Sequence, residues 1–343
     1  MPDAQQLVVR AQEKSWPHLA AGGAGGIATA IATAPLDVLR TRLQSNIYSP
    51  FQHSPSAATA TPSALSVRGW LQRARITSQN LLSTQRIQGW RGLYTGLGPS
   101  ILGVAPATAI KFYTYGNCKR IYASWFKIED SAPGVHVAAA ATAGIVTGTA
   151  TNPIWLIKTR LQLDHSTLPS PGSILRPRYR NSFHCAVQIF RQEGIRGFYR
   201  GLSASYLGVA ESALHLVLYE RIKDISRSSA SIPLHAADHE RSQKDARWNR
   251  ILSWLGVSGS AGIAKLIAGV IAYPHEVVRT RLRQAPLAGG RHQYTSLNQC
   301  IRTIWREEGF LAFYGGITPH MLRAVPSAAI TLGVYEAVLK HLR

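Results

Sequence analysis

Four ionisable residues stand in otherwise uncharged stretches of this sequence: Lys111, Glu211, Lys265 and Arg323. An ionisable group at the middle of a membrane is costly, so such residues should face a water-filled cavity. Three cations against one acid favour a polyanionic solute, because lysine binds phosphate as a point charge and arginine as a two-pronged donor. Glu211 can accept a hydrogen bond from an amine or ring N–H of the same solute. For Lys111 and Lys265, the alternative is a fixed pair with helix carbonyls or with Glu211.

Six apolar segments would position these residues, and they are long enough for helices that cross a bilayer. They are residues 15–36, 92–118, 131–157, 201–219, 251–275 and 309–335. The first and third contain no formal charge, and each of the others is interrupted by one of the four ionisable residues. Residues four apart lie on one helix face. The expected faces are Gly103, Ala107, Lys111 and Tyr115; Leu207, Glu211, His215 and Tyr219; and Arg323, Ser327, Thr331 and Tyr335. The charged residue of each of these three helices lies on the expected face, although the faces were chosen only by steps of four residues from the repeated tyrosine.

Three landmarks recur along the chain, each in three copies. One motif places basic residues five and seven positions after Pro35, Pro153 and Pro274, which lie 118 and 121 residues apart. The others are a glycine pair seven residues apart (89/96, 194/201, 309/316) and a later tyrosine (115, 219, 335). Such a period indicates internal repeats that form one body. We expect repeat 1 at 15–127, repeat 2 at 131–227 and repeat 3 at 250–343, with a polar linker at 228–249.

The composition separates a membrane protein from a soluble basic one. The chain has 343 residues and a net charge of +21, which is also typical of nucleic-acid binders. However, 45% of the residues are hydrophobic and only 16% are charged, and the aromatic residues lie within the apolar segments. Three cysteines without a paired spacing exclude a disulfide framework. We see no catalytic motif and no secretory signal, so an enzyme or a nucleic-acid partner is not expected.

Local signals add detail to the six helices. Each motif proline should kink the first helix of its repeat near its end. The pairs Gly22/Gly26 and Gly144/Gly148 would allow close helix approach. Short amphipathic helices are expected at Ser182–Glu193 and Ser296–Glu308.

The motif Px[DE]xx[KR]x[KR], followed by the glycine loop and [FY][DE]xx[KR], resembles the mitochondrial carrier family over nearly the whole chain. The resemblance implies an all-α membrane protein of six transmembrane helices in three tandem repeats with three-fold pseudosymmetry, plus short matrix-side amphipathic helices. Both termini would face the intermembrane space. The resemblance also implies a monomer in contact with inner-membrane lipid such as cardiolipin, without a cofactor or a bound metal.

The resemblance further implies two gates of ion pairs, which open alternately. On the matrix side, Asp37 would pair with Lys158, and Glu276 with Arg40. Trp155 stands where Arg279 would meet an acid, so the third pair is missing. A brace position two residues beyond the second base is matched by Gln44 and Gln162, whereas Arg283 departs from it. The other reading of these charges is helix ends at the membrane surface.

On the cytoplasmic side, Lys119 would meet Glu220, and Lys223 would meet Glu336. The third pair is absent on both sides, because its positions hold Gly116 and Leu339. A gate of two ion pairs that opens readily is therefore expected at this end.

The segment Asn152-Pro153-Ile154-Trp155 is similar to the sequences of one branch of the family. That branch transports nucleotides, dinucleotide cofactors, and folate or flavin compounds. Together with residues 203–208 and Glu211, it is most similar to the pyrimidine nucleotide carriers. The resemblance implies exchange of nucleotides such as UTP, CTP and dTTP across the mitochondrial inner membrane by alternating access. A carrier for NAD, FAD or a folate is the alternative. The expected substrate-binding residues are Lys111, Glu211, His215, Lys265, Arg323, Gly103, Leu207 and Gly208.

Overall fold

The computed structural model describes residues 4–45, 89–127, 129, 132–164, 178–211, 267–286 and 290–342. Every regular element in these ranges is helical. The named helices are α1 (Ala4–Gln44), α3 (Leu97–Phe126), α4 (Pro133–Asp164), α5 (Ser182–Gly197), α8 (Leu297–Glu307), the 3₁₀ helix η4 (Phe310–Tyr314) and α9 (Ile317–Leu342). Three further helical stretches cover residues 89–93, 202–211 and 267–282. The all-α class expected from the sequence is confirmed.

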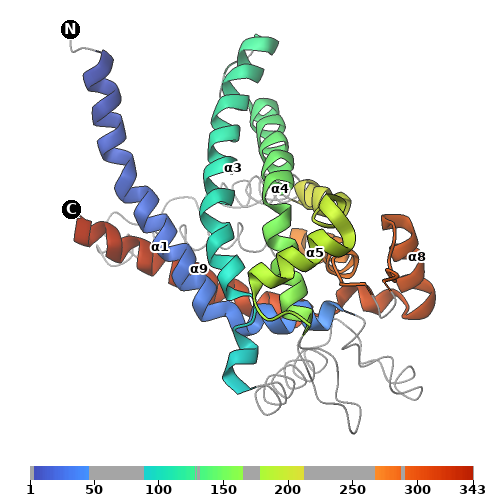
Figure 1. Ribbon diagram of the computed structural model, residues 1–343. Coiled ribbons are helices and arrows are strands. Elements are labelled where there is room, and N and C mark those ends of the chain that lie inside the picture. Colours follow the sequence, from blue (N-terminus) through green and yellow to red (C-terminus); the bar gives the residue numbers. More distant parts are fainter. Residues whose placement is uncertain are drawn as a thin grey trace, which may run out of the picture.

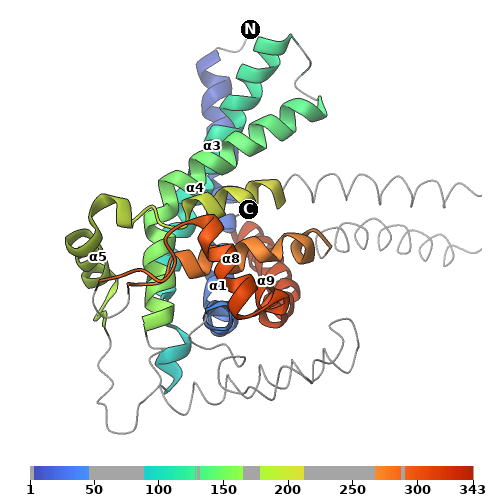
Figure 2. The ribbon, with the colours of Figure 1, turned by 90° about the vertical axis from the view of Figure 1, so that its right-hand side faces the viewer.

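The first and last helices of the chain lie side by side, and so do α3 and α4 (Figures 1 and 2). The hydroxyls of Thr29 on α1 and Thr331 on α9 are 2.8 Å apart and share a hydrogen bond. A side chain at Gly25 would lie 2.9 Å from the carbonyl oxygen of Thr331, so only glycine permits this approach. The N-terminal helix thereby closes the body against the C-terminal one.

The glycine pairs predicted to bring helices together act through one member each. A Cβ on Gly26 would lie 3.1 Å from Val104 of α3, and one on Gly144 would lie 3.0 Å from Val209. Gly22 and Gly148 have no neighbour within 4 Å of that position among the described residues. Each pair therefore allows a close helix approach, at one of its two glycines. Gly25, which belongs to neither pair, makes a closer approach than either of them.

The prolines of the repeated motif lie further from the helix ends than expected. α1 continues beyond Pro35 to Gln44, and α4 continues beyond Pro153 to Asp164. The motif's basic residues are thus helical and lie in the C-terminal turns of the same helices. The last expected span, 309–335, is nearly all contained in the apolar stretch Phe310–His341, but it is not one continuous helix. It begins with η4, turns at Gly316 with φ 79°, and becomes α9 only at Ile317.

Three stretches are long and apolar enough to cross a membrane within the described ranges. They are Ala21–Gln44, Gly89–Phe126 and Phe310–His341. Residues 212–219 of the expected fourth span, residues 251–266 of the fifth, and the linker 228–249 lie outside the described residues.

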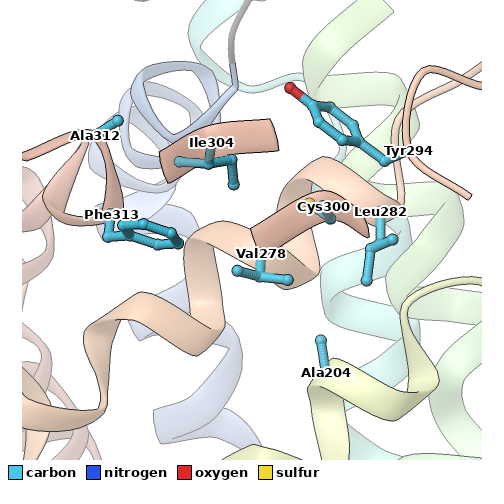
Figure 3. Close-up of a cluster of buried hydrophobic side chains, with 8 residues drawn as sticks. All are labelled: Ala204, Val278, Leu282, Tyr294, Cys300, Ile304, Ala312 and Phe313. Carbon is cyan, nitrogen blue, oxygen red and sulfur yellow. The ribbon is translucent and has the colours of Figure 1, made fainter. Parts of the chain in front are cut away.

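The two predicted amphipathic helices are present as α5 and α8. The side chain of Asn181 accepts a 2.7 Å hydrogen bond from the backbone N–H of His184, and Ser296 caps α8 through Gln299 in the same way. α8 and η4 cover one side of the helix over 267–282. Between them lies a buried cluster that also takes in Ala204 of repeat 2 (Figure 3). Its members are Ala204, Val278, Leu282, Tyr294, Cys300, Ile304, Ala312 and Phe313.

Candidate functional site

The acid of the first motif contacts two cations from different repeats. Asp37 Oδ2 is 3.4 Å from the ammonium of Lys158, and Oδ1 contacts the guanidinium of Arg323. The first pair is the one expected from the motif. The second was not expected, because Arg323 was assigned to the substrate cavity. One carboxylate therefore joins α1, α4 and α9.

The acid of the third motif also contacts two cations. Glu276 forms the expected ion pair with Arg40 of α1. Its other oxygen is 3.6 Å from Arg279, one turn along the same helix. Arg279, which has no acid opposite it at position 155, thus finds one on its own helix.

Trp155 fills the place of the third acid without making an ion pair. Its indole N–H donates a 3.0 Å hydrogen bond to Thr151, and the ammonium of Lys158 lies 5.4 Å from the ring centre. A Cβ on Gly103 would lie 3.1 Å from Ile154 and 3.5 Å from the Trp155 ring. Gly103, predicted to bind substrate, therefore packs against the α4 residues of this gate.

The second basic residues of the three motifs form a cyclic set of hydrogen bonds. Each guanidinium donates through Nε to the backbone carbonyl at the brace position of the next repeat. The three bonds are Arg42 to Gln162 (3.2 Å), Arg160 to Arg283 (3.2 Å) and Arg281 to Gln44 (2.9 Å). The order follows the three-fold relation between the repeats, so each repeat is tied to its neighbour at the end of the body that carries the three motifs.

Two of these arginines also form buried ion pairs with glutamates that stand directly before the repeated glycine pairs. Arg160 contacts both oxygens of Glu193, and Arg281 contacts both oxygens of Glu308. Burial would raise the pKa of Glu193, but the hydrogen bond from Arg160 and its charge outweigh burial and lower it. These acids were not predicted as functional. The sequence did contain a signal for them, since each acid directly precedes the first glycine of a repeated glycine pair.

The glycine that ends each loop motif makes a second cyclic contact. Gly96, Gly201 and Gly316 all have φ between 74° and 79°. A Cβ on Gly316 would lie 2.8 Å from the carbonyl oxygen of Arg40, and one on Gly201 would lie 3.2 Å from that of Arg279. The positive φ and the close backbone approach together explain the repeated glycine.

A cavity of about 320 Å³ lies beside the gate, between α3, α4 and the helices over 202–211 and 267–282. Its charged or titratable residues are Lys111, Glu211, His275, Glu276 and Arg279, and Ser205 and Gly208 also line it. Lys111, Glu211 and Gly208 were predicted to bind substrate, and the structure brings them to one cavity. Leu207 instead lines an apolar groove on the other side of its helix. Tyr115 turns to α4, where its hydroxyl is 2.6 Å from Nδ1 of His136.

His275 is a cavity residue that the sequence reasoning did not select. Its Nδ1–H donates a 2.5 Å hydrogen bond to the carbonyl of Ala272, which leaves Nε2 facing Glu211 at 3.8 Å. A Cβ on Gly208 would lie 3.1 Å from Nε2, so glycine makes room for the ring. The possible ligand atoms of Glu211, His275 and Glu276 lie within 4.8 Å of one another. Arg40 and Arg279 compete for Glu276, however, which disfavours a metal.

Four of the predicted site residues lie outside the described residues: His215, Lys265, Glu220 and Lys223. The expected gate partners of Glu220 and Lys223, which are Lys119 and Glu336, are among the described residues. Neither makes an ion pair with another residue of the described ranges. The cytoplasmic gate therefore stays a prediction.

Comparison with known proteins gives a family for the whole chain. The profile described as "Mitochondrial carrier protein" matches residues 11–124, 129–229 and 252–343. "Mitochondrial carrier protein rim2" of Schizosaccharomyces pombe is 44% identical over 325 residues, which cover 95% of this chain and 89% of that protein. "Mitochondrial pyrimidine nucleotide transporter RIM2" of Saccharomyces cerevisiae is 41% identical over 334 residues, covering 96% and 86%. "Solute carrier family 25 member 36" of Mus musculus is 37% identical over 332 residues, covering 96% and 98%. This chain therefore belongs to the mitochondrial carrier family and is a multi-pass protein of the mitochondrial inner membrane.

Proposed function

We propose that this chain exchanges pyrimidine nucleotides across the mitochondrial inner membrane. The observation that carries the proposal is the match along nearly the whole chain to a transporter named for pyrimidine nucleotides. The cavity supports it, because a nucleotide needs cations for its phosphates and a hydrogen-bonding group for its base. Lys111 and Arg279 are the cations, and Glu211 is an acceptor on the opposite helix.

The phosphates would be bound by Lys111, Arg279 and Arg323, with Lys265 as a further cation. Arg323 can contribute both prongs of its guanidinium to a phosphate, a geometry that lysine lacks. The base would be read by Glu211, which accepts from an exocyclic amine or a ring N–H. His215 would be a further contact beside Glu211, and Gly208 admits the base and the His275 ring to the same space.

Transport would proceed by alternation between two closed gates around this one site. Closing toward the matrix uses Asp37–Lys158 and Glu276–Arg40, with Trp155 and Arg279 at the third interface. Closing toward the intermembrane space would use Lys119–Glu220 and Lys223–Glu336. A ligand shifts such an equilibrium only by its differential affinity for the two states.

The contact of Arg323 with Asp37 supplies that differential affinity. A bound phosphate competes with the Asp37 carboxylate for Arg323. When the phosphate wins, Asp37 retains Lys158 alone, and the matrix gate loses one of the cations that join its helices. Substrate binding would thus loosen the gate through which the substrate leaves.

A proteoliposome exchange panel tests the function. Vesicles loaded with UTP should take up labelled UTP, CTP and dTTP, and should take up NAD, FAD and folate much more slowly. Uptake of NAD without uptake of any pyrimidine nucleotide would contradict the proposal and favour the NAD, FAD or folate alternative. Activity that depends on added cardiolipin, and a monomer mass in detergent, are the results expected for the lipid partner and the oligomeric state.

A further inference from the structure

The three interfaces between repeats are not closed by the same chemistry at the matrix end. The interface of repeats 1 and 2 has the ion pair Asp37–Lys158, and that of repeats 3 and 1 has Glu276–Arg40. At the interface of repeats 2 and 3, Trp155 replaces the acid of the motif, and the ion pair of Arg279 is with Glu276 on its own helix, beside a longer-range attraction to Glu211 of repeat 2. By the motif alone, this third interface would be the weak one.

A second relation between the repeats involves the residue before each motif proline and the brace residue of the next repeat. At the interface of repeats 3 and 1, the amide of Gln44 donates a 3.1 Å hydrogen bond to the hydroxyl of Tyr273. At the interface of repeats 1 and 2, the residue before the proline is Ala34, which has no polar side chain. At the interface of repeats 2 and 3, the two positions hold Asn152 and Arg283, and the guanidinium donates a 2.6 Å hydrogen bond to Asn152 Oδ1.

Both the oxygen and the nitrogen of the Asn152 side-chain amide make hydrogen bonds. Its Nδ2 donates a 2.7 Å hydrogen bond to the carbonyl of Phe198, in the turn after α5 of the same repeat. This bond orients Oδ1 toward Arg283, because only the amide nitrogen can donate to a carbonyl. The guanidinium also donates to Ser205 Oγ at 3.1 Å, and Ser205 in turn donates to the carbonyl of Gly201. One residue of repeat 3 therefore engages two helices of repeat 2.

The surroundings make this contact strong. Asn152 is fully buried and Arg283 is 6% exposed. No carboxylate lies within ion-pair distance of Arg283 among the described residues, so neutral oxygens carry its solvation. Ala204 and Leu282, the chain neighbours of Ser205 and Arg283, belong to the buried apolar cluster that excludes water from this interface (Figure 3). A hydrogen bond to a charged group in such surroundings is about twice as strong as a neutral one.

Because the brace position of repeat 3 holds arginine and not glutamine, the hydrogen bond of the threonine that would contact it also differs. Thr41 and Thr280 donate to the side-chain oxygens of Gln162 and Gln44, both at 2.7 Å. Arginine has no acceptor, and the equivalent Thr159 donates instead to the carbonyl of Trp155 on its own helix. Asn152 supplies the acceptor that Arg283 needs.

We infer that Asn152 and Arg283 form the third latch of the matrix gate, in place of the ion pair that Trp155 removes. All three interfaces share an arginine-to-carbonyl hydrogen bond, and each then has a further charged contact between side chains: an ion pair in two cases and an arginine–amide hydrogen bond in the third. Asn152 and Arg283 are positioning residues that act on the equilibrium between the two states. The inference rests on the proposed transport by alternating gates, but not on which nucleotide is carried.

Accessibility of the cavity from the matrix side tests the latch. Ala140 lines the cavity, so Ala140→Cys in a Cys118→Ser background reports whether an impermeant maleimide reaches it in inside-out inner-membrane vesicles. Asn152→Ala and Arg283→Ala should each raise the labelling rate roughly 10- to 100-fold, the effect of losing a hydrogen bond to a charged group. The double variant should label no faster than the faster single variant. Trp155→Glu, which restores an ion pair with Arg279, should return Asn152→Ala toward the parent rate.

Asn181→Ala is the matched control, since it removes the cap of α5 away from the interface. It should lower the thermal unfolding temperature without changing the labelling rate. The latch is refuted if Asn152→Ala behaves like this control, or if the two single effects multiply in the double variant. Because labelling needs no nucleotide, failure to exchange UTP would overturn the proposed function and leave this result standing.

Discussion

Arg323 of α9 and Lys158 of α4 contact opposite oxygens of one carboxylate, that of Asp37 on α1. The three residues come from three repeats, so this carboxylate joins α9 to the residues proposed for the matrix gate. If Arg323 binds the substrate phosphate in one state and the carboxylate of Asp37 in the other, substrate binding and closure of the matrix gate are coupled directly through this one side chain.

The first prediction concerns this coupling. Arg323→Ala should abolish or greatly reduce nucleotide uptake, because it removes both a phosphate ligand and the competition with Asp37. Insertion into the membrane should be unchanged. Arg323→Lys keeps the charge but loses the two-pronged geometry, and should retain part of the rate. Initial rates in proteoliposomes measure this, and near-normal uptake by the alanine variant would contradict the assignment. Lys265→Ala should lose transport in the same way.

Glu211→Gln tests recognition of the base. The change keeps the size of the side chain but replaces one acceptor oxygen with a donor amide. It should alter the ranking of UTP, CTP and dTTP more than the preference among mono-, di- and triphosphates. Competition of each nucleotide against labelled UTP gives both rankings. An unaltered base ranking would remove Glu211 from recognition.

Trp155→Glu should strengthen the matrix gate. The new carboxylate would face Arg279, which now shares Glu276 with Arg40. An added pair that couples by about 1–3 kcal/mol would shift the two-state ratio roughly 5- to 150-fold toward the state closed to the matrix. A thermal-shift assay with an inhibitor specific for one state detects the change. No shift would mean that Arg279 already has its full complement of contacts.

At the cytoplasmic end, Gly116→Asp with Leu339→Lys should create a third ion pair. The double variant should favour the state closed to the intermembrane space. Gly116→Asp alone should be more damaging, because an unpaired buried charge costs on the order of 3–5 kcal/mol. A double-mutant cycle on exchange rate and on thermal stability separates these effects. Strict additivity would show that the two positions are not partners.

The cysteines should differ in their reactivity. Cys185 and Cys300 are fully buried in α5 and α8, and burial raises the pKa of each thiol to about 12. The thiolate is the reactive form, so both should stay unlabelled by a maleimide at neutral pH until the protein unfolds. In a Cys118→Ser variant, labelling during heating should therefore follow unfolding itself. Rapid labelling of either residue in the folded protein would contradict their burial.

The sequence alone determined the repeats, the all-α class, and the ion pairs Asp37–Lys158 and Glu276–Arg40. Local spacing carries this information. A motif repeated at a nearly constant period places equivalent residues on equivalent helix faces, and the cyclic order of the repeats then decides which acid meets which base. The amphipathic helices α5 and α8 followed for the same reason, since their apolar positions recur with the helical period.

Other contacts depended on the tertiary structure. Arg323 and Asp37 are 286 positions apart, and no repeated motif relates them. Arg283 and Asn152 stand at positions that the repeats do relate, but their residue types differ from those at the other two interfaces, so the repeat alone did not indicate their hydrogen bond. His275 lies next to a motif proline, and only the approach of the helix bearing Gly208 turns it into a cavity residue. Spacing specifies the contacts that symmetry repeats. Contacts that depart from the symmetry depend on how closely two particular helices pack, which is a property of the assembled body and not of either segment.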